Sequence, residues 1–169
     1  VVSIGSTPTA VHVDHLAGVH EVRTGNYAFF DVMQVAIGSC APDDCALSVL
    51  ATVVSRTTAD RLVLDCGSKT LAADGARGFT PAAGHGDVFR DLAPTPGARP
   101  DPHLIVERLS EEHATVRVRA DAAPLATGAR VRVLPNHACV VSNLVDRAWL
   151  VEGLDVIDEL PIAARGRIQ

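Results

Sequence analysis

The feature that most constrains this fold is an alternation of apolar and charged residues with a period of two. It is clearest in ATVRVR at 114–119 and RVRVLP at 130–135, where valines alternate with arginines. Successive side chains of an extended strand point to opposite faces, so the pattern predicts strands with one buried face. The valines expected inside are Val116, Val118, Val131 and Val133, and the arginines expected outside are Arg117, Arg119, Arg130 and Arg132.

Further β-branched runs lie at 50–56 (LATVVSR), 61–64 (RLVL) and 104–109 (LIVERL). The first two are separated by TTAD, which is typical of a hairpin. Residues 72–103 are rich in Gly, Pro, Ala and Asp, which predicts a long, partly ordered loop. Many short strands joined by turns predict a mainly β fold, a barrel or a sandwich, and we assign it to residues 38–169.

Residues 1–37 have a different character. Val1 to Ile4 form a short β-branched run that stops at Gly5, the pattern of a buried parallel strand that feeds a loop. A polar stretch with three histidines follows, and then TGNYAFFD at 24–31, a turn signal before an aromatic run. We interpret residues 1–37 as the end of another domain.

Composition narrows the classes of function. Of 169 residues, 47% are hydrophobic and 21% charged, as in a folded protein, and only 4% are aromatic, so Val, Leu, Ile and Ala must build most of the core. The net charge of −5 and the lack of a basic cluster argue against nucleic acid and anionic membranes as main partners. No apolar run approaches the roughly 20 residues that span a bilayer.

The ends and the cysteines add two expectations. The chain does not begin with Met, and its first residues read neither as a signal peptide nor as a natural start, so we expect a truncated or proteolysed product. Nothing indicates secretion, and we therefore expect reduced thiols and a cytoplasmic location. The four cysteines are Cys40, Cys45, Cys66 and Cys139.

The first candidate for chemistry is the pair His137 and Cys139 in LPNHACVVSN. In a strand, positions i and i+2 point to the same side, so the imidazole and the thiolate would converge on one point. Both are zinc ligands, and two protein ligands leave positions open for water or substrate. Pro135 and Asn136 indicate a bend there, which suits a site at a barrel rim. The ordinary alternative is a buried polar residue beside a small hydrophobe.

The second candidate is the GSTPT loop at 5–9, a small-residue loop after a strand, which can present backbone N–H groups to a phosphate. Ser6 and Thr7 add hydroxyl donors. The turn that contains Gly25 and Asn26 is of similar character, and two such loops can hold one phosphate between them. The alternative is an ordinary turn in each place.

Other polar clusters favour structural readings. LSEEH at 109–113 is typical of a charged turn between two strands, and the histidines at 12, 15 and 20 do not share one face of a regular element. His85 reads as a loop residue, Cys66 as packing, and Lys69, the sole lysine, as a turn residue.

Taken in order, the motifs VSIGSTPT, GNYAFFD, LATVVSR, LDCGSKTLAAD, LSEEH and RVLPNHACVVSNLVD resemble one family. It is the fold-type III pyridoxal-phosphate family of D-threonine aldolase and D-serine dehydratase. The resemblance covers nearly the whole chain and is weakest over 75–103. It implies a C-terminal β-barrel-like domain over 38–169, preceded over 1–37 by the remnant of a TIM-like (β/α) barrel.

The resemblance also implies roles for residues. Ser6 and Thr7 match the family's phosphate-binding loop, and Gly25 and Asn26 its second phosphate-binding turn. The metal-ligand pair matches His137 and Cys139, with Zn²⁺ as the expected divalent metal. By the same resemblance, the aldolases have a carboxylate at the second ligand position, so the cysteine at 139 favours a dehydratase-like site. 

In this family the lysine that carries the cofactor lies before the region matched here, and Lys69 is not assigned that role. The resemblance therefore implies a lyase for D-β-hydroxy amino acids that is a homodimer when full length, with this chain alone inactive. The other hypotheses are an amino-acid racemase of the same fold and a non-enzymatic β-barrel interaction domain. A racemase has no need of the metal, so the H-x-C pair counts against it.

Overall fold

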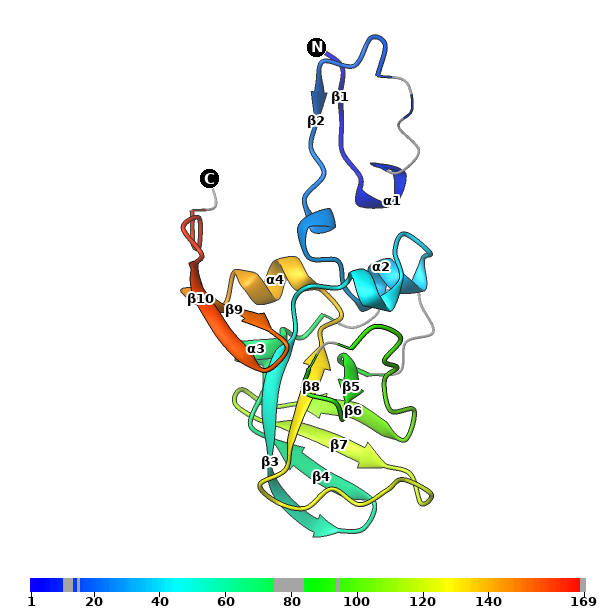
Figure 1. The fold of residues 1–169 in the computed structure, drawn as a ribbon, viewed down its shortest axis with the longest axis vertical. Coiled ribbons are helices and arrows are strands. Elements are labelled where there is room, and N and C mark those ends of the chain that lie inside the picture. The colour runs from blue at the N-terminus through cyan, green and yellow to red at the C-terminus, as the bar shows by residue number, and fades with distance from the viewer. Residues whose placement is uncertain (11–13, 15, 75–83, 94, 168–169) are drawn as a thin grey trace.

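The chain folds around a closed six-stranded barrel, with shorter elements gathered at one end (Figure 1). The structure is a computed structural model and describes all residues except 11–13, 15, 75–83, 94 and 168–169. The strands follow one another around the barrel in the order β3-β4-β7-β6-β5-β8. Their bounds are β3 Val49–Thr58, β4 Arg61–Leu64, β5 Asp87–Phe89, β6 Leu104–Leu109, β7 Ala114–Val118 and β8 Arg130–Leu134.

The predicted β-barrel is thus confirmed, and so is the hairpin of β3 and β4, which pair antiparallel. The expected loop over 72–103 is wrong in one respect. Residues 87–89 form β5, which pairs with β6 on one side and β8 on the other and closes the barrel. Three residues among glycines and prolines give too short a pattern to be read as a strand.

The barrel interior is aliphatic, as the low aromatic content predicts. Val116, Val118, Val131 and Val133 are buried, whereas Arg117 and Arg130 are exposed, which confirms the period-two argument. Arg132 departs from it in part, because its guanidinium lies 4.9 Å from the centre of the Phe89 ring and is half-buried. The core residues are Ala51, Val53, Leu62, Leu64, Cys66, Leu71, Val88, Leu104, Val106, Ala114, Val116, Val118, Val131 and Val133.

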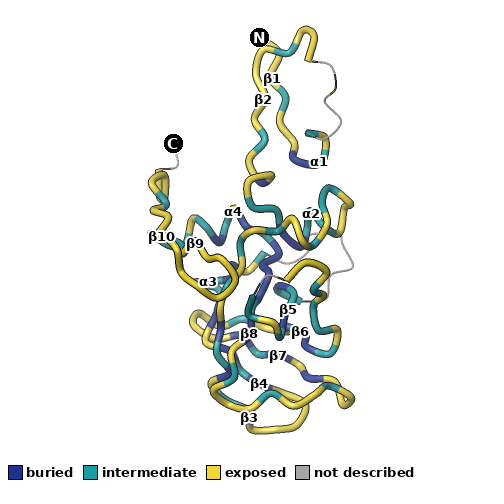
Figure 2. The backbone as a smooth tube through the Cα atoms, viewed as in Figure 1, coloured by how far each residue is buried: buried dark blue, intermediate teal, exposed yellow. Residues whose placement is uncertain are grey.

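Strand β8 is held on both sides. Val133 lies opposite Val49 of β3 and opposite Val88 of β5. The chain then leaves the barrel after Leu134 and passes through Pro135 and Asn136, both buried, into the region of the short helices. Figure 2 shows the buried backbone continuing from β8 toward that region.

Most of the short helical elements lie at the end of the barrel where β8 ends, whereas α1 lies farther out, in the N-terminal part beside β1 and β2 (Figure 1). The two elements labelled η are 3₁₀ turns of three residues each. The elements are α1 Thr7–Ala10, η1 Asn26–Ala28, α2 Val32–Ala36, η2 Pro42–Asp44, α3 Ser68–Leu71 and α4 Ala138–Ser142.

Near the N-terminus, two short strands form a ribbon that extends away from the barrel (Figure 1). Strand β1 (Ser3–Ile4) pairs in parallel with β2 (Glu21–Val22). The expected parallel strand is confirmed, but the expected burial is wrong: Val1 and Val2 are exposed, because within the described chain only β2 pairs with β1. The boundary at residue 37 stays a prediction.

A hairpin of β9 (Arg147–Glu152) and β10 (Asp155–Pro161) follows α4. Its two strands pair with each other and form a separate sheet from the barrel. Large apolar side chains on it are exposed, among them Trp149, Leu154 and Val156. In the described part of the chain, no helix has the length and apolar character needed to cross a membrane.

Candidate functional site

A buried carboxylate joins two helix starts. Asp31 caps α2, because one of its carboxylate oxygens accepts a hydrogen bond from the Gln34 backbone N–H at 3.0 Å. Its other oxygen accepts from the Asn26 side-chain amide at 2.6 Å and from the Ala138 backbone N–H at 2.9 Å. Asp31 is fully buried. We call these four residues the Asp31 junction.

The backbone turns helical directly after His137, which is itself extended, so the strand expected through His137 and Cys139 is wrong. His137 is the N-cap of α4, and Cys139 lies in the first turn of that helix. The β-branched run CVVS favours a strand on propensity, but here the chain has left the barrel, and Asp31 binds the backbone N–H of Ala138, just before the run. The argument that two strand positions converge therefore does not apply.

His137 is oriented by a second carboxylate. Its Nδ1 lies 2.7 Å from Oδ2 of Asp74, and both side chains are largely buried. Because an ionised carboxylate only accepts hydrogen bonds, this contact places the ring proton on Nδ1. The lone pair on Nε2 is then the one available to a metal ion or a substrate proton, the arrangement common to metal-binding histidines.

Asn136 ties the same region together from the other side. Its side-chain amide donates to the backbone carbonyl of Asp74 at 3.0 Å and to that of Gly84 at 2.9 Å. Asn136 is buried. The residue just before His137 therefore fixes the backbone of the residue that orients its ring.

The thiol of Cys139 is accessible. The residue is exposed, although partial burial of its sulfur, followed by the negative charge of Asp31, raises the pKa of the thiol. A free thiol with a raised pKa is protonated near neutral pH, so a cation must displace a proton to bind it. Among the described residues, no group of three or more His, Cys, Asp or Glu side chains is arranged to hold a metal ion.

His137 and Asp74 line a cavity of about 630 Å³. This volume is in the range of small-molecule sites. The lining also includes Pro8, the residue after Thr7, so the structure brings the GSTPT loop to the same cavity as His137. The other lining residues are Met33, Gln34, Ile37 and Val140, which are mostly apolar.

The two loops predicted to bind phosphate follow adjacent parallel strands. Ser6 and Thr7 come after β1, and Gly25 and Asn26 after β2. Because parallel strands end at the same edge, the two loops start side by side. The backbones approach so closely that a Cβ on Gly5 would lie 2.7 Å from the Arg23 carbonyl oxygen.

The side chain of Asn26 is already engaged. Its amide nitrogen donates to Asp31, and its carbonyl oxygen is buried with no hydrogen-bond partner among the residues that the structure describes. An anionic phosphate needs donors, and Asp31 already takes one N–H of this amide, so the contribution of the turn to a phosphate falls mainly to backbone N–H groups.

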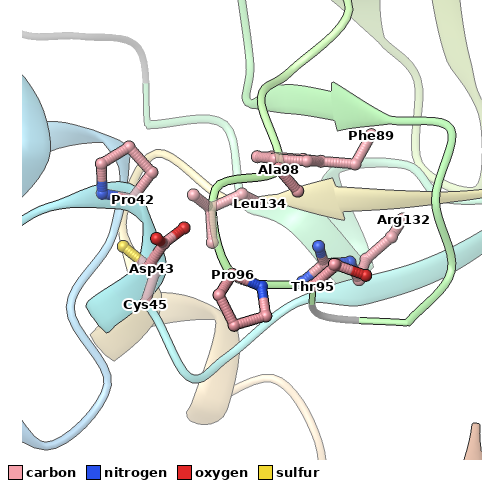
Figure 3. Close-up of a pocket in the computed structure, with 9 residues that line it drawn as sticks. All are labelled: Pro42, Asp43, Cys45, Phe89, Thr95, Pro96, Ala98, Arg132 and Leu134. Carbon is pink, nitrogen blue, oxygen red and sulfur yellow. The ribbon is translucent and has the colours of Figure 1, made fainter. Parts of the chain in front are cut away.

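A smaller pocket of about 90 Å³ lies on the outside of the barrel. Figure 3 shows Cys45 and Asp43 on one side of it and Arg132 with Thr95 on the other. Asp43 is occupied, because its carboxylate accepts from the Gly97 N–H at 2.9 Å. The volume is well below that of a typical ligand site, so the larger cavity is the candidate site.

The remaining polar clusters lie elsewhere. Lys69 is in α3, where its ammonium pairs with Glu111 at 2.8 Å and Glu112 at 2.7 Å in the exposed turn between β6 and β7. That confirms LSEEH as a charged turn. His20 accepts a hydrogen bond from the Val2 N–H through Nδ1. His12 and His15 lie outside the described residues.

Sequence reasoning missed Asp31 and Asp74. An aspartate before VMQVA is an N-cap signal, so the sequence could have identified Asp31 as a helix cap. Its contact with Ala138, which spans 107 residues, has no such signal. Asp74 had no signal, because it lies 63 residues from His137 in a segment that reads as loop.

Known structures share this fold. An alanine racemase-like protein from Idiomarina loihiensis aligns with a TM-score of 0.77 and 29% identity over 88% of this chain and 40% of that chain. D-threo-3-hydroxyaspartate dehydratase from Delftia sp. HT23 aligns with a TM-score of 0.78 and 35% identity over 95% of this chain and 43% of that one. D-threonine aldolase from Filomicrobium marinum gives 0.73 and 28%, over 99% and 42%.

The fold is therefore that of alanine racemase-like proteins and D-amino-acid lyases. A sequence profile described as a putative serine dehydratase domain matches residues 46–151. The chain belongs to the putative serine dehydratase domain family.

Sequence relatives differ greatly in length. An uncharacterized protein of Mycobacterium tuberculosis is 44% identical over 81% of this chain and 96% of its own length. The D-threo-3-hydroxyaspartate dehydratase of Delftia is 42% identical over 82% of this chain, and the D-serine dehydratase of Dictyostelium discoideum 32% over 85%. The chain spans 37% of each of these two enzymes.

Proposed function

We propose that this chain is the metal-binding and phosphate-binding part of a pyridoxal-phosphate- and metal-dependent lyase acting on D-β-hydroxy amino acids, with dehydration as the reaction. The observation that carries the proposal is the imidazole of His137, held through Nδ1 by Asp74 on the wall of a cavity that the GSTPT loop also lines. The chain alone is expected to be inactive.

The donor set fits a divalent cation. His137 offers Nε2 from a ring that is already oriented, and Cys139 offers an accessible thiol from the first turn of α4. In the Delftia dehydratase, a variant with one cysteine replaced by alanine is described as metal-free, and another variant replaces a histidine two positions earlier. His137 and Cys139 have the same spacing.

The phosphate side also fits. Ser6 and Thr7 follow β1, and Gly25 and Asn26 follow the adjacent parallel strand, so hydroxyl and backbone N–H donors gather at one edge. These residues would hold the phosphate of pyridoxal phosphate. When bound, the coenzyme withdraws electron density from the substrate's Cα, and the cation acts as a Lewis acid on its β-hydroxyl.

The chain's own residues supply orientation and exclusion of water. Asp74 holds the proton on Nδ1 of His137 and so keeps Nε2 as the ligand atom. The apolar side chains of Met33, Ile37 and Val140 limit the water around the polar groups of the cavity, which strengthens electrostatic interactions there. Loss of the β-hydroxyl gives a dehydratase, and its deprotonation with Cα–Cβ cleavage gives an aldolase. The thiol of Cys139, in place of a carboxylate, favours the dehydratase.

A metal titration of the chain tests the proposal. Zn²⁺ binding by calorimetry and Co²⁺ binding by thiolate absorption are expected to show one site per chain. His137→Ala and Cys139→Ala should each weaken binding at least about 10-fold. The matched controls are His113→Ala, in the exposed turn between β6 and β7, and Cys40→Ala, and both should bind as the wild type does.

Stoichiometric metal that persists in His137→Ala and Cys139→Ala would contradict the proposal. A wild-type chain that binds no metal would favour the non-enzymatic interaction domain. In a full-length enzyme that contains this chain, the same two substitutions should abolish metal-dependent turnover of D-serine and leave the coenzyme absorbance in place. A cytoplasmic location and a homodimer stay predictions.

A further inference from the structure

The carboxylate of Asp31 makes more contacts than a helix cap requires. Capping α2 uses one oxygen and one N–H, that of Gln34, and a serine or threonine at the surface does this equally well. Asp31 is instead fully buried, and removing a carboxylate from water is costly unless it is well hydrogen-bonded. Its second oxygen meets that need with two donors from other segments, Asn26 and Ala138.

The backbone reinforces the same connection. The Val32 N–H, at the start of α2, donates to the Pro135 carbonyl at 3.2 Å, and the Met33 N–H donates to the Asn136 carbonyl at 3.3 Å. With the Ala138 N–H bound to Asp31, the residues on both sides of His137 are hydrogen-bonded to the segment 31–33. The position of the His137 backbone is therefore set by that segment.

The junction reaches the other predicted site as well. The Asn26 side chain, which belongs to the turn proposed to hold phosphate, donates to the same Asp31 oxygen as the Ala138 N–H. One carboxylate thus ties the phosphate turn to the first residue of the helix that carries Cys139. If the Asp31 carboxylate moved, both the Asn26 turn and the start of α4 would lose the contact that holds them together.

We propose that Asp31 is a positioning residue that sets the start of α4, and with it His137 and Cys139, relative to the Gly25–Asn26 turn. This inference rests on the proposed function, which assigns a metal ion to His137 and Cys139 and a phosphate to the Gly25–Asn26 turn. Asp31 itself touches neither metal nor substrate and acts through the Ala138 amide and the Asn26 side chain.

Two variants of the chain separate positioning from capping. Asp31→Ser keeps a hydroxyl that can cap α2, but it is too short to reach Ala138 as well. Asp31→Asn keeps the length of the side chain, but its NH₂ group faces an N–H that donates to the carboxylate in the wild type. Both are expected to bind Co²⁺ about 10- to 100-fold more weakly than the wild type, with a shifted Co²⁺ absorption spectrum, at a temperature where circular dichroism shows them folded.

The matched control is Asp101→Asn. The carboxylate of Asp101 also accepts a backbone N–H, that of His103 at 2.8 Å, and pairs with Arg90, but it lies on the barrel. This variant is expected to melt at a lower temperature and to bind Co²⁺ within about 2-fold of the wild type.

Wild-type affinity and spectrum in folded Asp31→Ser would overturn the positioning role and leave the proposed metal site standing. A wild-type chain that binds no Co²⁺ would overturn both. A measurement on the wild type covers the case in which neither variant folds: the Ala138 amide should exchange with solvent as slowly as the buried barrel amides. Fast exchange at Ala138 alone would remove the contact on which the inference depends.

Discussion

At the scale of single residues, burial controls the chemistry of the cysteines. Cys66 is buried in the barrel core, and this burial, followed by the charge of Asp65, raises the pKa of its thiol to about 12 from an ordinary 9.0. Between these two values the folded chain keeps a proton that the unfolded chain has lost. The stability that this thiol contributes is therefore fully present below pH 9 and is lost as the pH rises from 9 to about 12.

The consequence is measurable as a difference between two proteins. Urea denaturation at pH 8 and at pH 10 should show a loss of about 1.4 kcal/mol in the wild type beyond that in Cys66→Ala, since one pKa unit corresponds to about 1.4 kcal/mol. The variant starts from a lower stability because it leaves a small cavity, but only the change between the two pH values matters. Equal losses in the two proteins would show that the Cys66 thiol ionises normally.

Residue-level reasoning from the sequence worked where the pattern was local. The alternation of valine and arginine placed Val116 and Val133 in the core correctly, because strand geometry alone decides which way they point. It failed at Cys139, since CVVS has strand propensity but the residue before it, Ala138, is bound by Asp31 from far away in the chain. The His137 contact with Asp74 is equally non-local.

At the scale of elements, α3 is packed against the turn between β6 and β7. Gly67, its N-cap, approaches so closely that a Cβ would lie 2.3 Å from the Glu111 carbonyl oxygen. The Ser68 and Lys69 N–H groups donate to the carbonyls of Ser110 and Glu111. Backbone contact therefore holds the start of the helix, in addition to the ion pairs of Lys69 with Glu111 and Glu112.

Gly67→Ala should lower the free energy of unfolding by about 1–3 kcal/mol, because the backbone has to move apart to admit the methyl group. The control is Gly25→Ala, where an added Cβ meets nothing within 4 Å and the backbone φ is an ordinary −112°. Its free energy of unfolding should change by less than about 0.5 kcal/mol. Guanidinium unfolding curves of the three proteins decide the matter, and a neutral Gly67→Ala would mean that α3 moves freely.

The elements themselves were partly predictable. Five of the barrel strands follow from β-branched runs of four or more residues, but β5 is only Asp87–Phe89 and has too few residues to show a period. The parallel pairing of β1 was foreseen from its apolar run before a glycine. The exposure of Val1 was not, because burial depends on what covers the strand rather than on the strand.

At the scale of the whole molecule, stability is divided unevenly. The barrel is closed and has a continuous core, whereas β1 with β2 and β9 with β10 are two-stranded ribbons. Among the described elements, β9 and β10 make only weak contacts outside their own hairpin. Isolated two-stranded ribbons are marginally stable in water.

Hydrogen exchange should therefore separate the molecule into two classes. Amides of Val53, Val106 and Val116 are expected to exchange only on global unfolding, and those of β1, β2, β9 and β10 through local opening, orders of magnitude faster. Mass spectrometry of peptic fragments after timed labelling gives both rates. Comparable protection in the hairpin and the barrel would show that the chain is one cooperative unit.

The pairing of β8 has a last consequence. Val131 and Val133 are both fully buried, and only three residues separate Val133 from His137. If β8 slipped by one position against β3 and β5, its valines would face water and its arginines the interior, which the aliphatic core forbids. The register of β8 against β3 and β5 thus determines, to within one residue, which side chain lies beside Asp74.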